Sequence, residues 1–167
     1  MASNLSALLL ISAEANLVPS SPYEGPGVRA TLNNGSSGAR LTDGTGSGQA
    51  DRIYRKSGTL AASATDTINL LAAGSLTDAL GQAIDLDELK QLVVKCVTGS
   101  IKVVRPSSNG LAFFVASTDG INLSAGQTNA TDFGAGGLAL STNATFEITD
   151  TAGGSGSTYE LYLVGAQ

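Results

Sequence analysis

The chain is a succession of short runs of β-type residues, each followed by a cluster of small polar residues. Gly accepts positive φ, and Ser, Thr, Asn and Asp bond to nearby backbone, so such clusters mark the ends of extended segments. The clusters are Pro19–Pro26, Asn33–Gly38, Asp43–Gly48, Ser107–Gly110, Asp119–Gly120, Gly134–Gly137 and Ala152–Ser157. Many short strands with turn signals at this spacing predict an all-β sandwich or barrel.

The runs between the clusters are the predicted strands. The first four are Leu5–Ser12, Val28–Leu32, Arg52–Lys56 and Thr67–Leu71. The others are Gln91–Val97, Ser100–Arg105, Leu111–Ala116, Leu138–Ser141, Ala144–Thr149 and Thr158–Val164. Because 167 residues suit one domain, we expect a single-domain antiparallel β-sandwich over residues 1–167. Residues 1–27 are expected to form an N-terminal strand or arm and a mobile loop.

The last two predicted strands show the clearest alternation of apolar and polar residues. The apolar positions on one face are Phe146 and Ile148 in the first strand, and Tyr159, Leu161 and Leu163 in the second. Successive residues of a strand point to opposite faces, so these positions are expected to line the core. The connecting segment Asp150–Ser157 has hairpin length and three glycines. It predicts that the two strands pair as an antiparallel hairpin that closes the domain.

One segment departs from the β pattern. Asp85–Lys90 has acidic residues first and a lysine last, an order that suits the helix dipole. Leu86 and Leu89 are three positions apart and would share a helix face. We therefore expect one helical turn here, a second turn at Ser75–Leu80, and helix below about 15% of the chain, less than the usual third.

The composition excludes most enzyme chemistry. The chain has no histidine, which excludes Ser-His-Asp and Cys-His catalysis and His-ligated zinc. Its one cysteine excludes an internal disulfide. The net charge of −5 argues against nucleic-acid binding, which relies on clustered Lys and Arg. The sequence therefore predicts a protein that is not an enzyme, with no catalytic, cofactor-binding or metal-binding residue.

Two segments carry residue types that can bind ions. The glycine-rich stretch Asp43–Gly48 has a phosphate-loop composition, but it lacks the G-x-G-x-x-G spacing and a following Lys-[ST], so a structural turn is favoured. The acidic residues Asp85, Asp87 and Glu88, with Asp78, offer oxygen ligands for calcium. They lack the EF-hand spacing, and the leucines between them are expected to contact the core.

Other candidate groups also have structural interpretations. Paired carboxylates can hydrolyse glycosides, but the absence of Trp leaves no obvious platform for a sugar ring. Cys96 lies in the alternating run Val94-Lys95-Cys96-Val97, so its side chain is expected to be buried as a small hydrophobic group. No histidine is present to activate its thiol.

Basic residues form two groups in the sequence. The first is Arg52, Arg55 and Lys56; the second is Lys90, Lys95, Lys102 and Arg105. The second group alternates along predicted strands and is expected to form a solvated face. Such a face either remains solvated, or docks on another protein surface through charge complementarity.

The N-terminal segment superficially resembles a secretory signal. Leu8–Ile11 is apolar and Ala13–Ala15 offers small residues, but no Lys or Arg precedes Arg29. The apolar run is also far shorter than the roughly 18 residues that span a bilayer. We expect a structured strand here and no membrane association.

Several motifs of the chain resemble a widespread group of small phage structural proteins. The similar segments are Leu41–Asp51, Ser57–Ser63, Leu76–Gly81, Leu89–Val94, Ser157–Leu161 and Val164–Gly165, with Pro19–Pro26 looking like an insertion. The chain departs from the group at Ser107–Ala112, which lacks the paired glycines often present there. The resemblance implies a jelly-roll-like β-sandwich that serves as a capsid decoration (cement) protein, or as a related tail or fibre part. It carries over no catalytic residues.

The leading functional expectation is a non-enzymatic phage virion protein, assembled in the host cytoplasm. Its expected partners are the major capsid protein and its own copies, as a dimer or trimer, through an N-terminal arm that adds a strand to an exposed edge. The alternative is a tail, fibre or spike part that binds a receptor or carbohydrate. That alternative requires exposed aromatic residues on loops, for which Tyr23, Tyr54, Phe113 and Phe114 are the candidates.

Overall fold

The computed structural model describes residues 12–17, 28–33, 41–71, 76–77, 83–116, 119–142 and 144–167. All regular secondary structure in these ranges is β-strand, which confirms the predicted all-β class. Within them, no helix has the length and apolar character needed to cross a membrane. Tyr23, Asp78 and the cluster Pro19–Pro26 lie outside the described residues.

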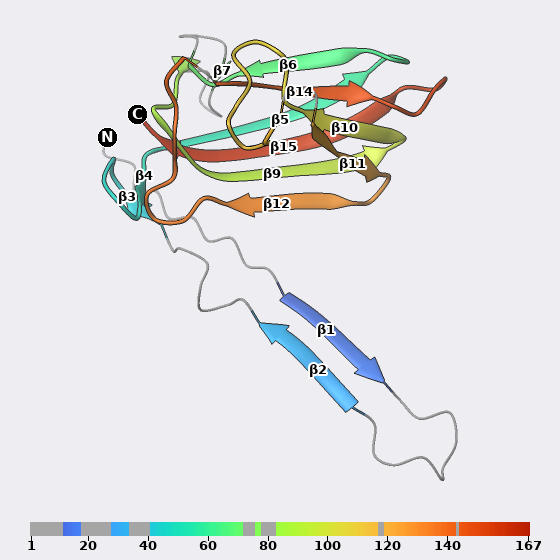
Figure 1. Ribbon diagram of the computed structural model, residues 1–167, viewed down its shortest axis with the longest axis horizontal. Coiled ribbons are helices and arrows are strands. Elements are labelled where there is room, and N and C mark those ends of the chain that lie inside the picture. Colours follow the sequence, from blue (N-terminus) through green and yellow to red (C-terminus); the bar gives the residue numbers. More distant parts are fainter. Residues whose placement is uncertain are drawn as a thin grey trace.

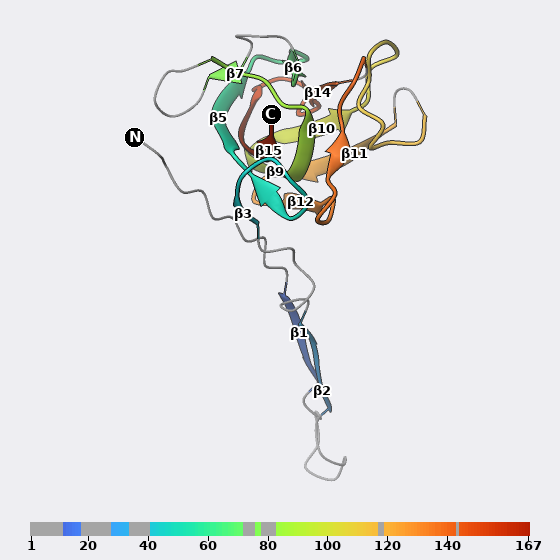
Figure 2. The same cartoon turned by 90° about the vertical axis from the view of Figure 1, so that its left-hand side faces the viewer.

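Two antiparallel sheets lie one over the other and form the sandwich (Figure 1). The five-stranded sheet consists of β12 (Thr128–Asp132), β9 (Glu88–Thr98), β15 (Ser157–Ala166) and β5 (Arg52–Leu60) in that order, with β13 (Leu138–Ala139) also paired to β9. The four-stranded sheet has the order β11 (Gly120–Ser124), β10 (Ser100–Val104), β14 (Thr145–Asp150) and β6 (Thr65–Asn69). Seen along the strands in Figure 2, the two sheets enclose a common interior.

The core fills the space between the two sheets. Its buried members include Leu92, Val94 and Cys96 of β9, Tyr159, Leu161 and Leu163 of β15, Ile101 and Val103 of β10, and Phe146 and Ile148 of β14. In each strand these residues alternate with more exposed ones, as a half-buried strand requires. The inward faces predicted from the last two strands are therefore confirmed.

Most consecutive strands of the sandwich lie in different sheets, although β10 and β11 pair with each other, and the crossing from β14 to β15 overturns the predicted C-terminal hairpin. β14 pairs with β10 and β6, whereas β15 pairs with β9 and β5. The same crossing links β5 to β6, β9 to β10 and β11 to β12. The physical reason is burial of apolar side chains. Each strand has one apolar face, and two strands in different sheets bury these faces by packing against each other across the core. The loop Asp150–Ser157 has hairpin length but spans the gap between the sheets.

The predicted helical turn at Asp85–Lys90 is also wrong. β9 begins at Glu88, and the Asp87 amide donates to the carbonyl of Ala166 at 2.8 Å. The long ladder between β9 and β15 supplies backbone partners that one helical turn would forfeit. The core contacts predicted for Leu86 and Leu89 are confirmed, since both are fully buried.

The remaining strand predictions meet mixed outcomes. Seven predicted strands overlap observed ones: Val28–Leu32, Arg52–Lys56, Thr67–Leu71, Gln91–Val97, Ser100–Arg105, Ala144–Thr149 and Thr158–Val164. In three of them the prediction runs past the strand end, at Leu70–Leu71, Arg105 and Ala144. Leu111–Ala116 instead forms turns and bends, because Arg105 donates to the carbonyls of Phe114 and Val115 and holds the segment as a loop. The predicted strand Leu138–Ser141 is reduced to β13. The polar strands β11 and β12 were not predicted, since their composition resembles that of turns.

Three short strand pairs, two antiparallel and one parallel, complete the described structure. β3 (Thr42–Asp43) and β4 (Gln49–Ala50) pair in parallel, and β7 (Leu76–Thr77) pairs with β8 (Ala83–Ile84). β7 occupies part of the segment Ser75–Leu80, where a helical turn was expected; the rest of that segment lies outside the described residues. β1 (Ser12–Leu17) and β2 (Val28–Asn33) form an antiparallel pair that we call the N-terminal hairpin. Of the predicted strand Leu5–Ser12, only Ser12 is described.

The N-terminal hairpin stands apart from the sandwich. β1 and β2 pair with each other and with no other described strand. Figures 1 and 2 show the hairpin outside both sheets, directed away from them. The described chain resumes at Leu41, which is packed against the five-stranded sheet.

Candidate interaction surfaces

The glycine-rich segment Asp43–Gly48 forms a turn between β3 and β4, as predicted. Its amides bond within the protein: Gly44 donates to the Ala50 carbonyl, Gly46 to the Gln49 side-chain oxygen, and Gly48 to the Ala135 carbonyl. An anion-binding loop directs several such amides outward at one ligand. This segment uses them to fold the chain.

The described acidic candidates for calcium, Asp85, Asp87 and Glu88, do not form a group that could hold a metal ion. Glu88 forms an ion pair with Lys90, and the Asp87 backbone joins the ladder beside β15. Among the described residues, no group of three or more His, Cys, Asp or Glu side chains is placed to hold a metal ion. Asp78, the fourth candidate, lies outside the described residues.

Cys96 is fully buried in the core, as predicted. Burial raises the pKa of its thiol, because the charged thiolate loses its hydration. At neutral pH the side chain is therefore a protonated, poorly nucleophilic group.

The aromatic candidates for ligand binding are largely covered. Tyr54 is 8% exposed, and Phe113 is partly buried with its ring 4.3 Å from that of Phe114 and 5.7 Å from that of Phe133. The large hydrophobic side chains that are exposed among the described residues are aliphatic: Ile53, Val97 and Val115. The described loops thus lack the open aromatic platform expected for a carbohydrate site.

The first basic group is neutralised locally by acidic partners. Arg55 lies 3.7 Å from the Glu160 carboxylate and 5.2 Å from the centre of the Tyr162 ring, and Lys56 lies 2.5 Å from the Asp66 carboxylate. Asp66 also accepts a hydrogen bond from the Tyr159 hydroxyl. Because Lys56 is on β5 and Asp66 is on β6, this pair joins the two sheets along one edge.

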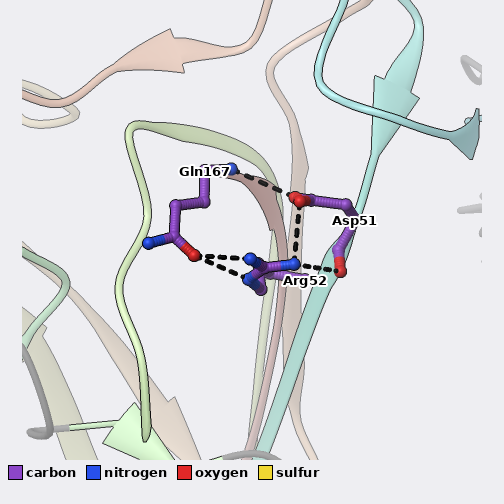
Figure 3. A network of polar contacts seen from close by, with 3 residues as sticks. All are labelled: Asp51, Arg52 and Gln167. Carbon is purple, nitrogen blue, oxygen red and sulfur yellow. Dashed lines mark hydrogen bonds and ion pairs between the residues drawn. The ribbon is translucent and has the colours of Figure 1, made fainter.

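Arg52 joins the beginning of β5 to the end of the chain (Figure 3). Its guanidinium lies 2.8 Å from the Asp51 carboxylate and donates to the Gln167 side-chain oxygen at 2.5 and 2.9 Å. The backbone amide of Gln167 donates in turn to the Asp51 carboxylate, which closes the network. The network fixes the point where the chain enters the five-stranded sheet.

The second basic group does not form the solvated face that alternation predicted. Lys95 is exposed and Lys102 and Arg105 are partly exposed, but Lys90 is fully buried. The Lys90 ammonium donates to the Glu88 carboxylate and to the carbonyls of Ala135 and Gly136, at 3.1 and 3.2 Å for the carbonyls. Burial of a lysine is tolerated when its donors are satisfied in this way. Lys90 therefore holds the turn between β12 and β13 against the sheet.

The outer face of the five-stranded sheet carries an apolar stripe across its strands. The register aligns Arg55, Tyr162, Val93 and Ala130 in one row. Tyr162, Val93 and Ala130 are partly exposed, and Ile53 in the neighbouring row is 45% exposed. We call Ile53, Tyr162, Val93 and Ala130 the outer stripe.

Leu41 and Ala50 cover one end of this outer face. Leu41 and Ala50 form a second buried cluster with Val164, whose position on β15 alternates with the inward-facing Leu163. Leu41 and Ala50 are therefore anchored on the same face that bears the outer stripe.

A polar cluster closes the opposite end of the sandwich. Asp150 and Ser157 are both nearly inaccessible, and the Ser157 hydroxyl donates to the Asp150 carboxylate. The Ser63 amide donates to the same carboxylate at 2.9 Å, and the Ser100 amide donates to the Ser157 hydroxyl at 3.0 Å. The hydrogen bonds from Ser157 and Ser63 lower the pKa of Asp150.

Replacing Ser157 by alanine is expected to lower the free energy of unfolding by about 1–3 kcal/mol, because the Ser100 amide loses its acceptor. The lowered pKa of Asp150 stabilises the fold above about pH 4, the ordinary range of the carboxyl, and this stabilisation disappears as the pH falls through the lowered pKa. The loss of stability on acidification should therefore be shallower in Ser157→Ala. Urea unfolding between neutral and strongly acidic pH measures both effects. Ser155→Ala, at an exposed position of the same loop, should retain the original profile.

In comparisons with known proteins, no protein-family model, no curated protein and no solved structure matches this chain.

Proposed function

We propose that this protein is a non-enzymatic structural component of a phage particle, a capsid decoration protein that binds the major capsid protein and its own copies. The proposal rests on the resemblance of segments such as Leu41–Asp51 and Ser57–Ser63 to phage structural proteins. It includes a jelly-roll fold, which is supported by eight strands in two facing sheets, β12-β9-β15-β5 and β11-β10-β14-β6. Jelly rolls are used in viral capsids, although also in lectins, so the fold alone does not select the function.

The observation that carries the proposal is the N-terminal hairpin. A two-stranded hairpin is marginally stable in water by itself. β1 and β2 are paired with no further described strand, and they lie outside the sandwich (Figure 1). A segment of this kind is stabilised when it packs on another molecule, which is the task of an assembly arm. The proposed localisation is accordingly the virion.

Binding of the purified full chain to phage shells that lack it tests this function. We expect saturable binding, with a copy number in native particles comparable to that of the major capsid protein. Deleting residues 1–15 removes most of β1 and is expected to abolish the association. The deletion should leave the thermal unfolding of the sandwich unchanged, because the hairpin shares no described strand pairing with it. Unchanged binding by the deletion variant would refute the role of the arm.

A receptor- or carbohydrate-binding part of a tail or spike is the alternative. It predicts glycan-array binding by the isolated protein and few copies per particle. The covered state of Tyr54 and the packing of Phe113 with Phe114 and Phe133 favour the decoration role over this one.

A further inference from the structure

Residues 41–50 lie on the outer face of the five-stranded sheet, and we call them the strap. One row of residues on this face crosses β5, β15, β9 and β12: Ile53, Val164, Gln91 and Asp132. The strap packs on Val164 at one point, and its Gly48 is bonded to Ala135, just beyond β12, at another. The strap therefore passes over Gln91, and this side chain is 5% exposed.

Few contacts attach the strap to the rest of the fold. Its apolar contacts belong to a small cluster of Leu41, Ala50 and Val164, which is separate from the main core. Among the described residues, one backbone hydrogen bond joins the strap to another part of the fold, from the Gly48 amide to the Ala135 carbonyl at 2.8 Å. The strands β3 and β4 pair with each other inside the strap. Lifting the strap as a unit therefore breaks few interactions.

The strap covers a polar group that has no partner. In the part of the chain that the structure describes, the side-chain nitrogen of Gln91 is the buried polar side-chain atom without a hydrogen bond. Gln91 alternates with the inward-facing Leu92 on β9, so its side chain belongs to the outer face, under the strap. A buried amide without a partner is costly, because it loses its hydration and gains no hydrogen bond. The closed strap therefore contains an unfavourable term that contact with water relieves.

We infer that the strap is a detachable cover, which lifts from the outer face as a local unit while the two sheets stay folded. Closure gains the burial of Leu41 against Val164 and the hydrogen bond of Gly48, but it costs the hydration of Gln91. Proteins open locally where few apolar contacts oppose the opening. The main core is a separate cluster and is left undisturbed. The inference does not depend on the proposed function.

Opening of the strap changes the accessible surface of the sheet. The row with Val164 and Gln91 is adjacent to the row with Tyr162, Val93 and Ala130, because residues of one face are two positions apart along each strand. Lifting the strap adds an apolar side chain and the N–H donors of an amide to the outer face. The strap thus controls access to one end of that face.

Thiol labelling of the full chain under native conditions tests the inference. Gln91→Cys places a thiol beneath the strap, and native Cys96 on the same strand is fully buried on the inward face. An aromatic disulfide reagent should label position 91 at least about 100-fold faster than Cys96, since the first requires local opening and the second global unfolding. Low urea concentrations should leave the rate at position 91 unchanged, because local opening exposes little surface. Equal labelling rates of the two thiols would overturn the inference.

Leu41→Ala weakens the apolar contact that holds the strap. Combined with Gln91→Cys, it should accelerate labelling at position 91 at least about tenfold and leave the labelling of Cys96 unchanged. Ile53→Ala is the matched control, since Ile53 is an apolar residue of the same row that is already 45% exposed. It should leave both rates unchanged. Equal acceleration at both thiols in Leu41→Ala would show that the strap unfolds only with the core, which contradicts the inference.

Replacing Gln91 by methionine provides a second readout in the opposite direction. Gln91→Met removes the amide without a partner and keeps the length of the side chain, so the strap should open less often. Hydrogen exchange of the Gly48 amide, measured by NMR, should slow at least about fivefold, the low end expected for an unsatisfied buried group. Lys95→Met, at an exposed position on the same face of β9, should leave that exchange unchanged. Unchanged or faster exchange at Gly48 in Gln91→Met would show that the amide does not oppose closure, and the inference would be wrong.

Discussion

Replacing Lys90 by methionine is expected to lower the free energy of unfolding by about 3 kcal/mol, near the low end of the roughly 3–5 kcal/mol lost when a buried ion pair is broken. The Lys90 side chain is fully buried, and three acceptors depend on its ammonium: the Glu88 carboxylate and the carbonyls of Ala135 and Gly136. The loss is at the low end because Glu88 is partly exposed and is hydrated when Lys90 is removed. Methionine retains most of the side-chain volume, so the effect reports lost hydrogen bonds and charge pairing.

Urea unfolding of Lys90→Met measures this loss, and Lys95→Met is the matched control. Lys95 is on the same strand but exposed, so its replacement should change the stability by less than about 0.5 kcal/mol. The Ala135 carbonyl also accepts from the Gly48 amide at 2.8 Å. Faster hydrogen exchange at Gly48 in Lys90→Met would show that the lysine also holds the segment Leu41–Ala50. Equal stability of the two variants would contradict the structural role assigned to Lys90.

Replacing Phe146 by alanine should have the largest effect in the core, about 3–5 kcal/mol, from the lost transfer free energy and the cavity that remains. Phe146 is 1% exposed and lies between the sheets with Ile148 on the same strand. The adjacent Glu147 belongs to the outer face, and Glu147→Ala should stay within about 0.5 kcal/mol. Thermal and urea unfolding of the two variants compare the inner and outer faces of one strand. A small effect of Phe146→Ala would mean that the two sheets do not pack as described.

Local alternation was sufficient to predict most strands and the faces of the last two. Phe146 and Ile148 alternate with polar residues, as do Tyr159, Leu161 and Leu163, and all five are buried. The period of two is a property of extended backbone, so it can be recognised without knowing the partner strand. The same is true of the turn at Asp43–Gly48.

Strand pairing was not predictable in this way. The loop Asp150–Ser157 has the length of a hairpin, yet it connects different sheets, because the choice depends on which buried faces meet across the core. Asp85–Lys90 has a helical pattern locally, but the ladder beside Ala166 draws it into extended structure. The polar strands β11 and β12 form because β10 and β9 offer them backbone partners.

The candidate surfaces show the same limit. Lys90 belongs to an alternating series that predicts exposure, but the Glu88 carboxylate and the carbonyls of Ala135 and Gly136 make its burial favourable. The outer stripe combines Ile53, Val93, Ala130 and Tyr162, which are distant in the sequence.

The sequence by itself determined that this chain is all-β, because turn clusters and period-two alternation are local signals. Its lack of histidine and its one cysteine likewise restricted the chemistry before any fold was known. Only the tertiary structure decided which strands pair, which lysine is buried, and which apolar residues form one outer surface. Those outcomes depend on contacts between residues far apart in the chain, and a local pattern carries no record of its distant partner.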